Sequence, residues 1–499
     1  MFKINKIFFF SALVLIIGIA LRAQELMSNN FLFLLDQGRD MMAVKGILYD
    51  HHQTLIGPAT SLRGVFQGPL WYYLLALSTA IFAGDPWGGI VLMFTISIAV
   101  LLVVFLWMKN LFGGKAALIT LFLFAVSSEA AAAATYTWNP HPMWLLVVIY
   151  IFTFYSTIYK SNKFNILLWP TIGLMFHFQT ALAVFILIAT GIYCLVFERK
   201  IFTRNFIIGI ILFLFTFIPQ ILFEIRHDFL MSRSALNLFT GSEQGLFVGG
   251  EKTKYMKLMS DHVFSFYNNF NSAFINDGIA KHISDLFILL ILLPIFLIKK
   301  KRNIFPENES AFISFMVKLL LIIFLLSFAY PFPLRYWFLT GFQSFYLIIL
   351  GLLLSRFLTE RLGKIIVIFI FAILVFYSWQ RINALYFNPP NDGGADKIKG
   401  KLSAIDYVYK DAKGKPFGFL VFTPAVYTDA YDYLIWWYGK GKYDYVPHKE
   451  KKGTFYLLME TDRAKPWSNK GWRETVVKTG NILETITLPT GLIIEKRSM

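Results

Sequence analysis

Long apolar runs separated by short polar segments fill the first three quarters of the chain. Such runs are typical of helices that cross a bilayer, because about 20 apolar residues span its hydrocarbon core. The pattern predicts about eleven membrane-spanning helices, at residues 7–22, 88–108, 116–134, 143–159, 164–178, 180–197, 205–222, 284–298, 311–329, 335–355 and 364–381. Because Lys3 and Lys6 precede the first run and no clear cleavage site follows it, we expect an uncleaved span, with a signal peptide as the alternative.

Most basic residues fall in the short segments between these runs. They cluster at residues 109–115, 160–163, 199–204, 299–302 and 356–364. Such clusters mark cytoplasmic loops under the positive-inside rule. With a cytoplasmic N-terminus, residues 23–87, 223–283 and everything after 382 then lie outside. The sequence therefore predicts a multi-pass protein of a bacterial plasma (inner) membrane.

Segment 69–83 is apolar but too short to cross the membrane. Its aromatic residues suit the lipid–water interface, so we expect a juxtamembrane helix on the outer surface. If it crossed the membrane, every later basic cluster would move to the outside.

The pattern changes near residue 382. Strand-like runs follow at 417–422, 454–459 and 492–496, with helix-like stretches near 401–411 and 428–438. The predicted fold class is therefore an all-α polytopic membrane domain over residues 1–381, with external loops at 23–87 and 223–283. A small extracytoplasmic α/β domain over residues 382–499 follows it.

Composition supports a membrane protein and excludes several other classes. Of the 499 residues 57% are hydrophobic and 15% are charged, whereas soluble domains carry about 25% charged residues. The net charge of +17 first suggests nucleic-acid binding, but the bases lie between apolar runs, so we expect no nucleic-acid partner. The single cysteine, Cys194, excludes an intrachain disulfide and a cysteine-based zinc site. No Walker-type loop or strand-linked GxGxxG is present, so a cytosolic nucleotide-binding domain is absent.

The segment after the first span carries the most suggestive polar cluster. If residues 36–48 begin a helix, Asp36 and Asp40 share one face and Arg39 can reach Asp36. Two nearby carboxylates repel each other, so the pKa of one is expected to rise, which suits a general base. A helix cap with a solvated salt bridge explains the same spacing.

Three later motifs follow one another along the chain, and their order carries a resemblance to a known family. They are Gly68-Pro69-Leu70-Trp71-Tyr72-Tyr73, Leu111-Phe112-Gly113-Gly114-Lys115 and Trp138-Asn139-Pro140. Together with Asp36 they resemble the GT-C superfamily, and most closely its dolichyl-phosphate-mannose protein mannosyltransferase and aminoarabinose transferase group, which includes the RgtA/B/C/D-like branch. The resemblance covers residues 1–230 well and the rest loosely. It implies an acidic residue just after the first span and a juxtamembrane helix that opens at Gly-Pro-Leu.

The chain departs from the aminoarabinose transferases just before this helix. Those enzymes carry an acidic–basic pair where Gln67-Gly68 stands here. A second carboxylate and a phosphate-binding lysine are therefore missing. Arg63, Asp40 or a residue of another loop would have to replace them.

The resemblance implies a membrane glycosyltransferase with a lipid-linked donor. Because no nucleotide sugars occur outside the plasma membrane, a polyprenyl phosphate is the expected carrier. Asp36 is the candidate base, and direct displacement would invert the anomeric centre. Asp40 would orient the acceptor or, less favoured, help to bind a metal; no metal ligand set or cofactor is predicted, and a divalent cation is left open. The acceptor would be a cell-envelope glycan, a lipid or a protein.

Cations near the outer membrane surface are candidates to bind the donor phosphate. Arginine can hold phosphate with two parallel N–H groups. Instead of binding phosphate, Arg335 could anchor the protein at the membrane interface, and Arg226 could lie in a solvated loop. The phosphate candidates are Arg63, Arg226, Arg335 and Tyr336, and the substrate-cavity candidates are Arg39, Gln67, Trp138, Asn139, His141 and His177. Each histidine is equally explained as a hydrogen-bonded packing residue.

Two other classes of protein remain. One is a transporter or flippase of lipid-linked glycans, and the other is a non-enzymatic membrane scaffold with a sensing tail. Transporters often place charges at the membrane midplane. Here the spans hold almost no charge, with Lys318 as the main exception. We therefore favour the glycosyltransferase.

Overall fold

The computed structural model of the chain describes residues 6–240, 255–274, 305–359, 361–387, 394–462 and 464–499. The predicted span 284–298 and the basic cluster 299–302 lie outside the described residues, as does part of the second predicted external loop. The helices before the C-terminal domain are α1 Lys6–Ser28, α2 Leu35–Leu48, α3 Leu70–Ile81, α4 Trp87–Phe112, α5 Gly114–Val126, α6 Ser128–Ala132, α7 Met143–Tyr159, α8 Asn165–Met175, α9 Thr180–Phe197, α10 Arg204–Thr216, α11 Ile218–Arg226, α12 Leu230–Thr240, α13 Tyr255–Ser272, α15 Glu307–Ser327, α16 Gln343–Phe357 and α17 Arg361–Ile382.

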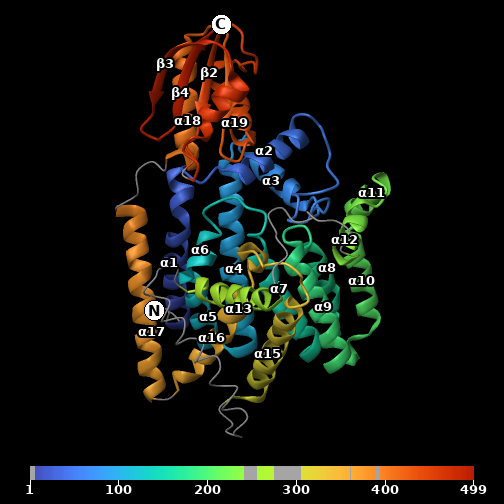
Figure 1. The fold of residues 1–499 in the computed structure, drawn as a ribbon. Coiled ribbons are helices and arrows are strands. Elements are labelled where there is room, and N and C mark those ends of the chain that lie inside the picture. Colours follow the sequence, from blue (N-terminus) through green and yellow to red (C-terminus); the bar gives the residue numbers. More distant parts are fainter. Residues whose placement is uncertain (1–5, 241–254, 275–304, 360, 388–393, 463) are drawn as a thin grey trace.

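Within the described ranges, five helices are long and apolar enough to cross a membrane: α1, α4, α9, α15 and residues 363–387. A sixth forms if α10 and α11, which meet at 49°, are one broken span. The apolar helices α5, α7 and α16 are shorter, and Pro170 interrupts the eleven-residue α8. The chain is thus a multi-pass helical membrane protein (Figure 1), and the count of eleven spans stays a prediction.

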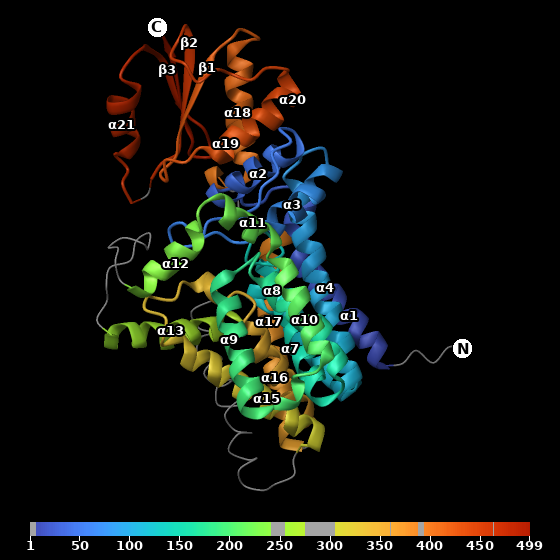
Figure 2. The same ribbon diagram turned by 90° about the vertical axis from the view of Figure 1, so that its right-hand side faces the viewer.

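Helices α2 and α3 lie together at one end of the bundle (Figure 2). The predicted juxtamembrane helix 69–83 is α3, which begins directly after Pro69, as expected because proline fits the first turn of a helix. The opposite end holds the connection between α4 and α5. There Gly113 has a φ of +86°, a conformation that favours glycine, and the chain reverses between the two helices.

Arg22 of α1 is a charged residue inside the bundle. It is fully buried and donates to Ser97 Oγ of α4 over 2.8 Å. It also donates to the carbonyl oxygens of Phe124 and Ala125, each over 2.8 Å. These carbonyls end α5 and lack partners within the helix. Arg22 thus joins three helices and satisfies a helix terminus, which explains how the bundle holds this charge.

The C-terminal α/β domain, residues 394–499, sits on the same end of the bundle as α2 and α3 (Figures 1 and 2). Its helices are α18 Ile398–Ala412, α19 Asp429–Leu434, α20 Lys440–Tyr443 and α21 Ser468–Trp472, and its strands are β1 Gly418–Phe422, β2 Thr454–Met459, β3 Asn481–Thr487 and β4 Ile493–Ser498. The sheet order is β1-β2-β4-β3, with β1 and β2 parallel and the other pairs antiparallel.

Three of the four strands lie where the sequence predicts them, and β3 is missed. Buried Phe455 and Leu457 give β2 a clear apolar pattern, whereas β3 is exposed along most of its length. An edge strand of this kind gives little hydrophobic signal. The fold class is confirmed as helical with a small C-terminal sheet.

The domain is fixed to the start of the first loop by backbone contacts. The amide of Phe33 donates to Asp396 O over 3.0 Å, and the amide of Ile398 donates to Phe31 O over 2.9 Å. Lys397 forms an ion pair with Glu25 over 2.9 Å. The chain segment before α2 and the segment before α18 therefore pair like short strands.

Candidate active site

The three charged residues predicted to act together do meet on α2. Arg39 Nη1 donates to Asp36 Oδ1 over 2.9 Å, while its Nη2 and Nε donate to Asp40 Oδ1 over 2.7 and 2.9 Å. One guanidinium thus binds both carboxylates. The spacing i, i+3, i+4 places all three on one side of the helix.

The two carboxylates have different surroundings. The Asp40 side chain is 0% exposed, whereas that of Asp36 is 41% exposed. The indole N–H of Trp71 donates to Asp40 Oδ2 over 2.7 Å. Burial raises the pKa of Asp40 to about 6, although Arg39 and Trp71 oppose the change. Asp40 is buried and holds Arg39, and its contact with an acceptor stays a prediction.

Asp36 is the accessible carboxylate of the pair. The indole N–H of Trp138 donates to Asp36 Oδ2 over 3.0 Å, so each oxygen has one donor and still has lone pairs available. The acidic residue of the first loop and the Trp-Asn-Pro motif are about one hundred positions apart. The fold brings them into direct contact.

Aromatic rings surround Trp138 beside Asp36. Its centroid lies 5.9 Å from that of Tyr136, 6.1 Å from that of Tyr336 and 6.3 Å from that of Trp337. The Arg335 guanidinium lies 6.0 Å from the centroid of Trp337. Tyr336 is 70% exposed. The segment that carries Arg335 and Tyr336 thus lies beside Trp138, although it is distant from Asp36 in the sequence.

His141 supports this aromatic group from within the protein. Its Nδ1 donates to Tyr136 O over 3.1 Å, and its ring lies edge-on to those of Tyr136 and Trp138. Burial lowers the pKa of His141 to about 4. The ring is therefore neutral at pH 7, and its contacts indicate a packing role.

Sequence reasoning missed two residues near this site, Tyr136 and Arg381. Tyr136 and Tyr336 lie within electrostatic reach of both Asp36 and Glu129. Arg381 of α17 interacts with Glu129 and donates to Ser128 O over 3.1 Å. The one signal for Tyr136 is its place two residues before the Trp-Asn-Pro motif. Nothing in the sequence links residue 381 to residue 129.

The remaining candidates lie in buried connections or on the surface. Asn139 Nδ2 donates to Gln67 Oε1 over 2.9 Å and to Phe178 O over 3.0 Å. His177 accepts from the Leu70 amide at Nδ1 over 3.3 Å, and its Nε2 lies 2.9 Å from Thr216 O. These three predicted cavity residues therefore connect α3 with the loops around α7, α8 and α10.

Arg63 and Arg226 are exposed and lie in another part of the same end of the bundle. The loop that carries Arg63 runs beside α11 and α12, where Phe66 packs edge-on against Phe223. No contact among the described residues joins either arginine to the carboxylate of Asp36.

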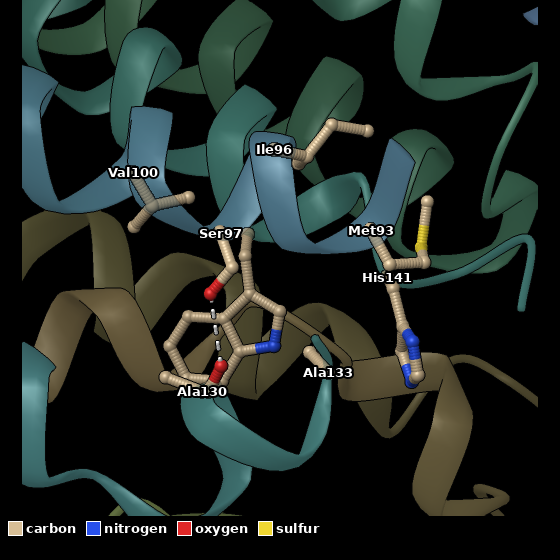
Figure 3. Close-up of a pocket in the computed structure, with 8 residues that line it drawn as sticks. Met93, Ile96, Ser97, Val100, Ala130, Ala133 and His141 are labelled. Atoms are coloured by element: carbon tan, nitrogen blue, oxygen red, sulfur yellow. Dashed lines mark hydrogen bonds between the residues drawn. The ribbon is translucent and has the colours of Figure 1, made fainter. Parts of the chain in front are cut away.

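A small cavity lies behind the aromatic group (Figure 3). Its walls include Met93, Ser97, Val100, Ala130 and His141, and the Ser97 hydroxyl donates to Ala130 O over 3.4 Å. Its volume is about 10 Å³, which is room for one water molecule. It is too small for a sugar and belongs to the packing behind the site.

The residues around Asp36 do not form a metal-binding set. In the described part of the chain, no three His, Cys, Asp or Glu side chains gather closely enough to hold an ion. Arg39 lies between Asp36 and Asp40, where a divalent cation bound to both carboxylates would have to lie.

Comparison with known proteins agrees with this arrangement. Residues 67–223 match the family model of the dolichyl-phosphate-mannose-protein mannosyltransferases. This range begins at the Gln-Gly-Pro-Leu motif and includes Trp138-Asn139-Pro140. No curated protein sequence matches the chain.

Solved structures share the fold at low sequence identity. The oligosaccharyltransferase of Archaeoglobus fulgidus, in complex with zinc and sulfate, is 12% identical over 97% of this chain and 72% of that chain, with a TM-score of 0.54. AglB of the same organism, bound to an inhibitory peptide and a dolichol-phosphate, is 11% identical over 99% and 74%, with a TM-score of 0.50. ArnT from Cupriavidus metallidurans, bound to undecaprenyl phosphate, is 10% identical over 98% and 97%, with a TM-score of 0.48.

The family match and the shared fold confirm the resemblance drawn from the motifs. Residues 67–223 are thus similar to the protein mannosyltransferase family, and the chain as a whole shares the fold of the oligosaccharyltransferase.

Proposed function

We propose that this protein is a membrane glycosyltransferase that transfers a sugar from a polyprenyl phosphate to an acceptor hydroxyl, with Asp36 as the base. The observation that carries the proposal is the geometry of Asp36. Its accessible carboxylate is held by Arg39 and by Trp138 at the end of a membrane bundle. The family match over residues 67–223 supports a lipid-linked donor.

The proposed reaction is a single displacement at the anomeric carbon. The acceptor oxygen attacks this carbon while the bond from the carbon to the phosphate oxygen breaks. The acceptor proton passes to Asp36, and the bonding electron pair leaves with the polyprenyl phosphate. The products are the glycosylated acceptor, with inverted anomeric configuration, and free polyprenyl phosphate.

The charges around Asp36 suit this reaction. A cation bound to Asp36 alone would weaken it as a base, but Arg39 is largely paired with Asp40 through two N–H groups. Asp40 thus offsets the charge of Arg39, which continues to orient Asp36. Arg335 and Tyr336, across the aromatic group, would donate to the leaving phosphate.

The proposed location of the reaction is the outer face of a bacterial plasma membrane. The basic clusters 109–115, 160–163, 199–204 and 356–364 lie at helix connections opposite the end that carries α2 and the C-terminal domain (Figure 1). Under the positive-inside rule, α2 and the C-terminal domain would then lie outside. The acceptor would be a cell-envelope glycan, a lipid or a protein.

The test is a donor assay on the purified full-length protein. The protein, reconstituted in lipid, is incubated with a panel of polyprenyl-phosphate sugars and acceptors, and free polyprenyl phosphate is measured. We expect release with at least one donor and none with Asp36→Asn. Movement of an intact lipid-linked sugar across the bilayer, with no release by any donor, would indicate a transporter instead.

A further inference from the structure

Helix α2 is held between two layers of the protein. One face carries Asp36 and Asp40, which bind Trp138 and Trp71 of the membrane domain. Gly38 lies midway between Asp36 and Asp40 in the sequence and therefore on the opposite face of the helix. This face packs on α19 of the C-terminal domain. The position of the acidic face therefore depends on what supports the other face.

At Gly38 the backbone of α2 lies directly against the backbone of α19. A Cβ atom added at Gly38 would lie 2.2 Å from the amide nitrogen of Ala430 and 2.4 Å from its Cα. Both are backbone atoms, so no side-chain rotation can relieve the overlap. Ordinary contacts begin at 3.4 Å. Only glycine lets the two backbones touch here.

Further contacts fix α19 and the residues after it to Gly84 and to the C-terminal end of α2. The Tyr433 hydroxyl donates to Gly84 O over 2.6 Å. The Trp436 ring packs edge-on against Tyr49, with centroids 4.8 Å apart, and the Lys45 ammonium lies 5.3 Å from its centroid. These contacts place α19 independently of Gly38.

One turn beyond Gly38 the two layers separate. A cavity of about 170 Å³ lies between Met42 of α2 and the domain, lined also by Phe419, Ile435 and Val446. Close packing on this face of α2 therefore occurs at the Gly38–Ala430 contact, near Asp36, and again at Lys45 and Tyr49 at the far end of the helix.

We propose that the C-terminal domain positions the catalytic helix, and that the backbone contact of Gly38 with Ala430 sets the location of Asp36. Gly38 is a positioning residue that never touches substrate. The inference rests on the proposed function, because it takes Asp36 as the base.

The test compares two identical changes on one helix. Gly38→Ala must separate the two backbones by about 1 Å, a displacement that can cost roughly 100-fold in rate. Gly46→Ala is the matched control, because a Cβ there meets its nearest neighbour, His52 Cβ, at 4.0 Å. Alanine favours the helix at both positions, so any difference must come from the contact.

The readout is turnover per binding site. Release of polyprenyl phosphate gives kcat and KM, and the number of sites comes from the stoichiometry of bound polyprenyl phosphate. We expect Gly38→Ala to lower kcat per site roughly 100-fold with an unchanged KM for the donor, and Gly46→Ala to match the unsubstituted protein. Equal kcat per site in both variants, including a case with merely fewer sites, would overturn the proposal.

A second variant tests the proposal if the Gly38→Ala protein does not fold. The double change Tyr433→Phe and Lys397→Met loosens the domain without altering α2. It should lower kcat per site while KM stays the same, and an unchanged kcat would overturn the proposal. If Asp36→Asn is as active as the unsubstituted protein, the proposed function itself fails; an inactive Asp36→Asn beside a fully active Gly38→Ala refutes only this inference.

Discussion

The indole N–H of Trp71 donates to the buried Oδ2 of Asp40 over 2.7 Å. Trp71 follows the Gly-Pro-Leu motif that opens α3, so α3 supports the helix with the proposed base. The motif therefore contributes a polar contact as well as a helix start. Loss of this contact should be measurable in both stability and pH dependence.

Trp71→Phe should lower the free energy of unfolding by about 1–3 kcal/mol, because a buried carboxylate oxygen loses its donor. It should also raise the pKa of Asp40 further, since the lost bond favours the charged form. The acid limb of the pH–activity curve should move to higher pH. Trp87→Phe, which removes an indole bond to Leu26 O, should leave that limb in place.

Activity should fall as the pH drops through about 6, the raised pKa of Asp40. Protonation of Asp40 weakens its hold on Arg39, which then pairs more fully with Asp36. Asp40→Asn should remove this titration, leaving a low and flatter profile. A profile whose acid limb is the same in both proteins would contradict the assignment.

Protonation of Asp40 should lower activity but raise the free energy of unfolding. Because the folded pKa lies above the ordinary value of 3.8, the folded protein binds this proton more tightly than the unfolded chain does. The contribution is fully present below about pH 4 and is lost as the pH rises to about 6. Denaturant unfolding at several pH values, with Asp40→Asn as the reference, would measure it.

Arg335→Ala should raise the donor KM roughly tenfold or more, because a hydrogen bond between charged groups contributes about 1.5–3 kcal/mol. Arg226→Ala, at the exposed end of α11, should not. KM for the lipid-linked donor distinguishes the two. A larger effect at Arg226 would move the phosphate site toward α11 and α12.

The sequence predicts the local features of this site and misses those that depend on distant contacts. The spacing of Asp36, Arg39 and Asp40 is enough to predict their pairing, since neighbours on a helix face meet whatever surrounds them. The apolar runs likewise predict α1, α4, α9 and α15, because each run is continuous and uninterrupted by proline.

Contacts between distant segments escape such reasoning. Asp36 and Asp40 look equivalent in the sequence, yet burial under Trp71 separates their roles. Asn139 and His177 read as cavity residues because polar groups stand out in apolar runs, but their partners are the side chain of Gln67, an amide and carbonyl groups. The close approach of Gly38 to Ala430 leaves no periodic signal at all.

Asn139→Ala should destabilise the protein by about 1–3 kcal/mol, since it removes the donor to two buried acceptors, the Gln67 side-chain oxygen and the Phe178 carbonyl. Turnover per folded molecule and donor KM should stay the same. Thermal unfolding combined with site-normalised kinetics would show this. A specific change in acceptor or donor KM would return Asn139 to the substrate cavity.

The most direct test of the account is kcat for polyprenyl-phosphate release by Asp36→Asn at saturating donor, compared with Asp50→Asn. Asp50 is an exposed carboxylate paired with Lys45 just beyond α2. Loss of the base should lower kcat roughly 10²- to 10⁴-fold in Asp36→Asn, while Asp50→Asn turns over normally. Equal rates in the two variants would contradict the proposed role of Asp36.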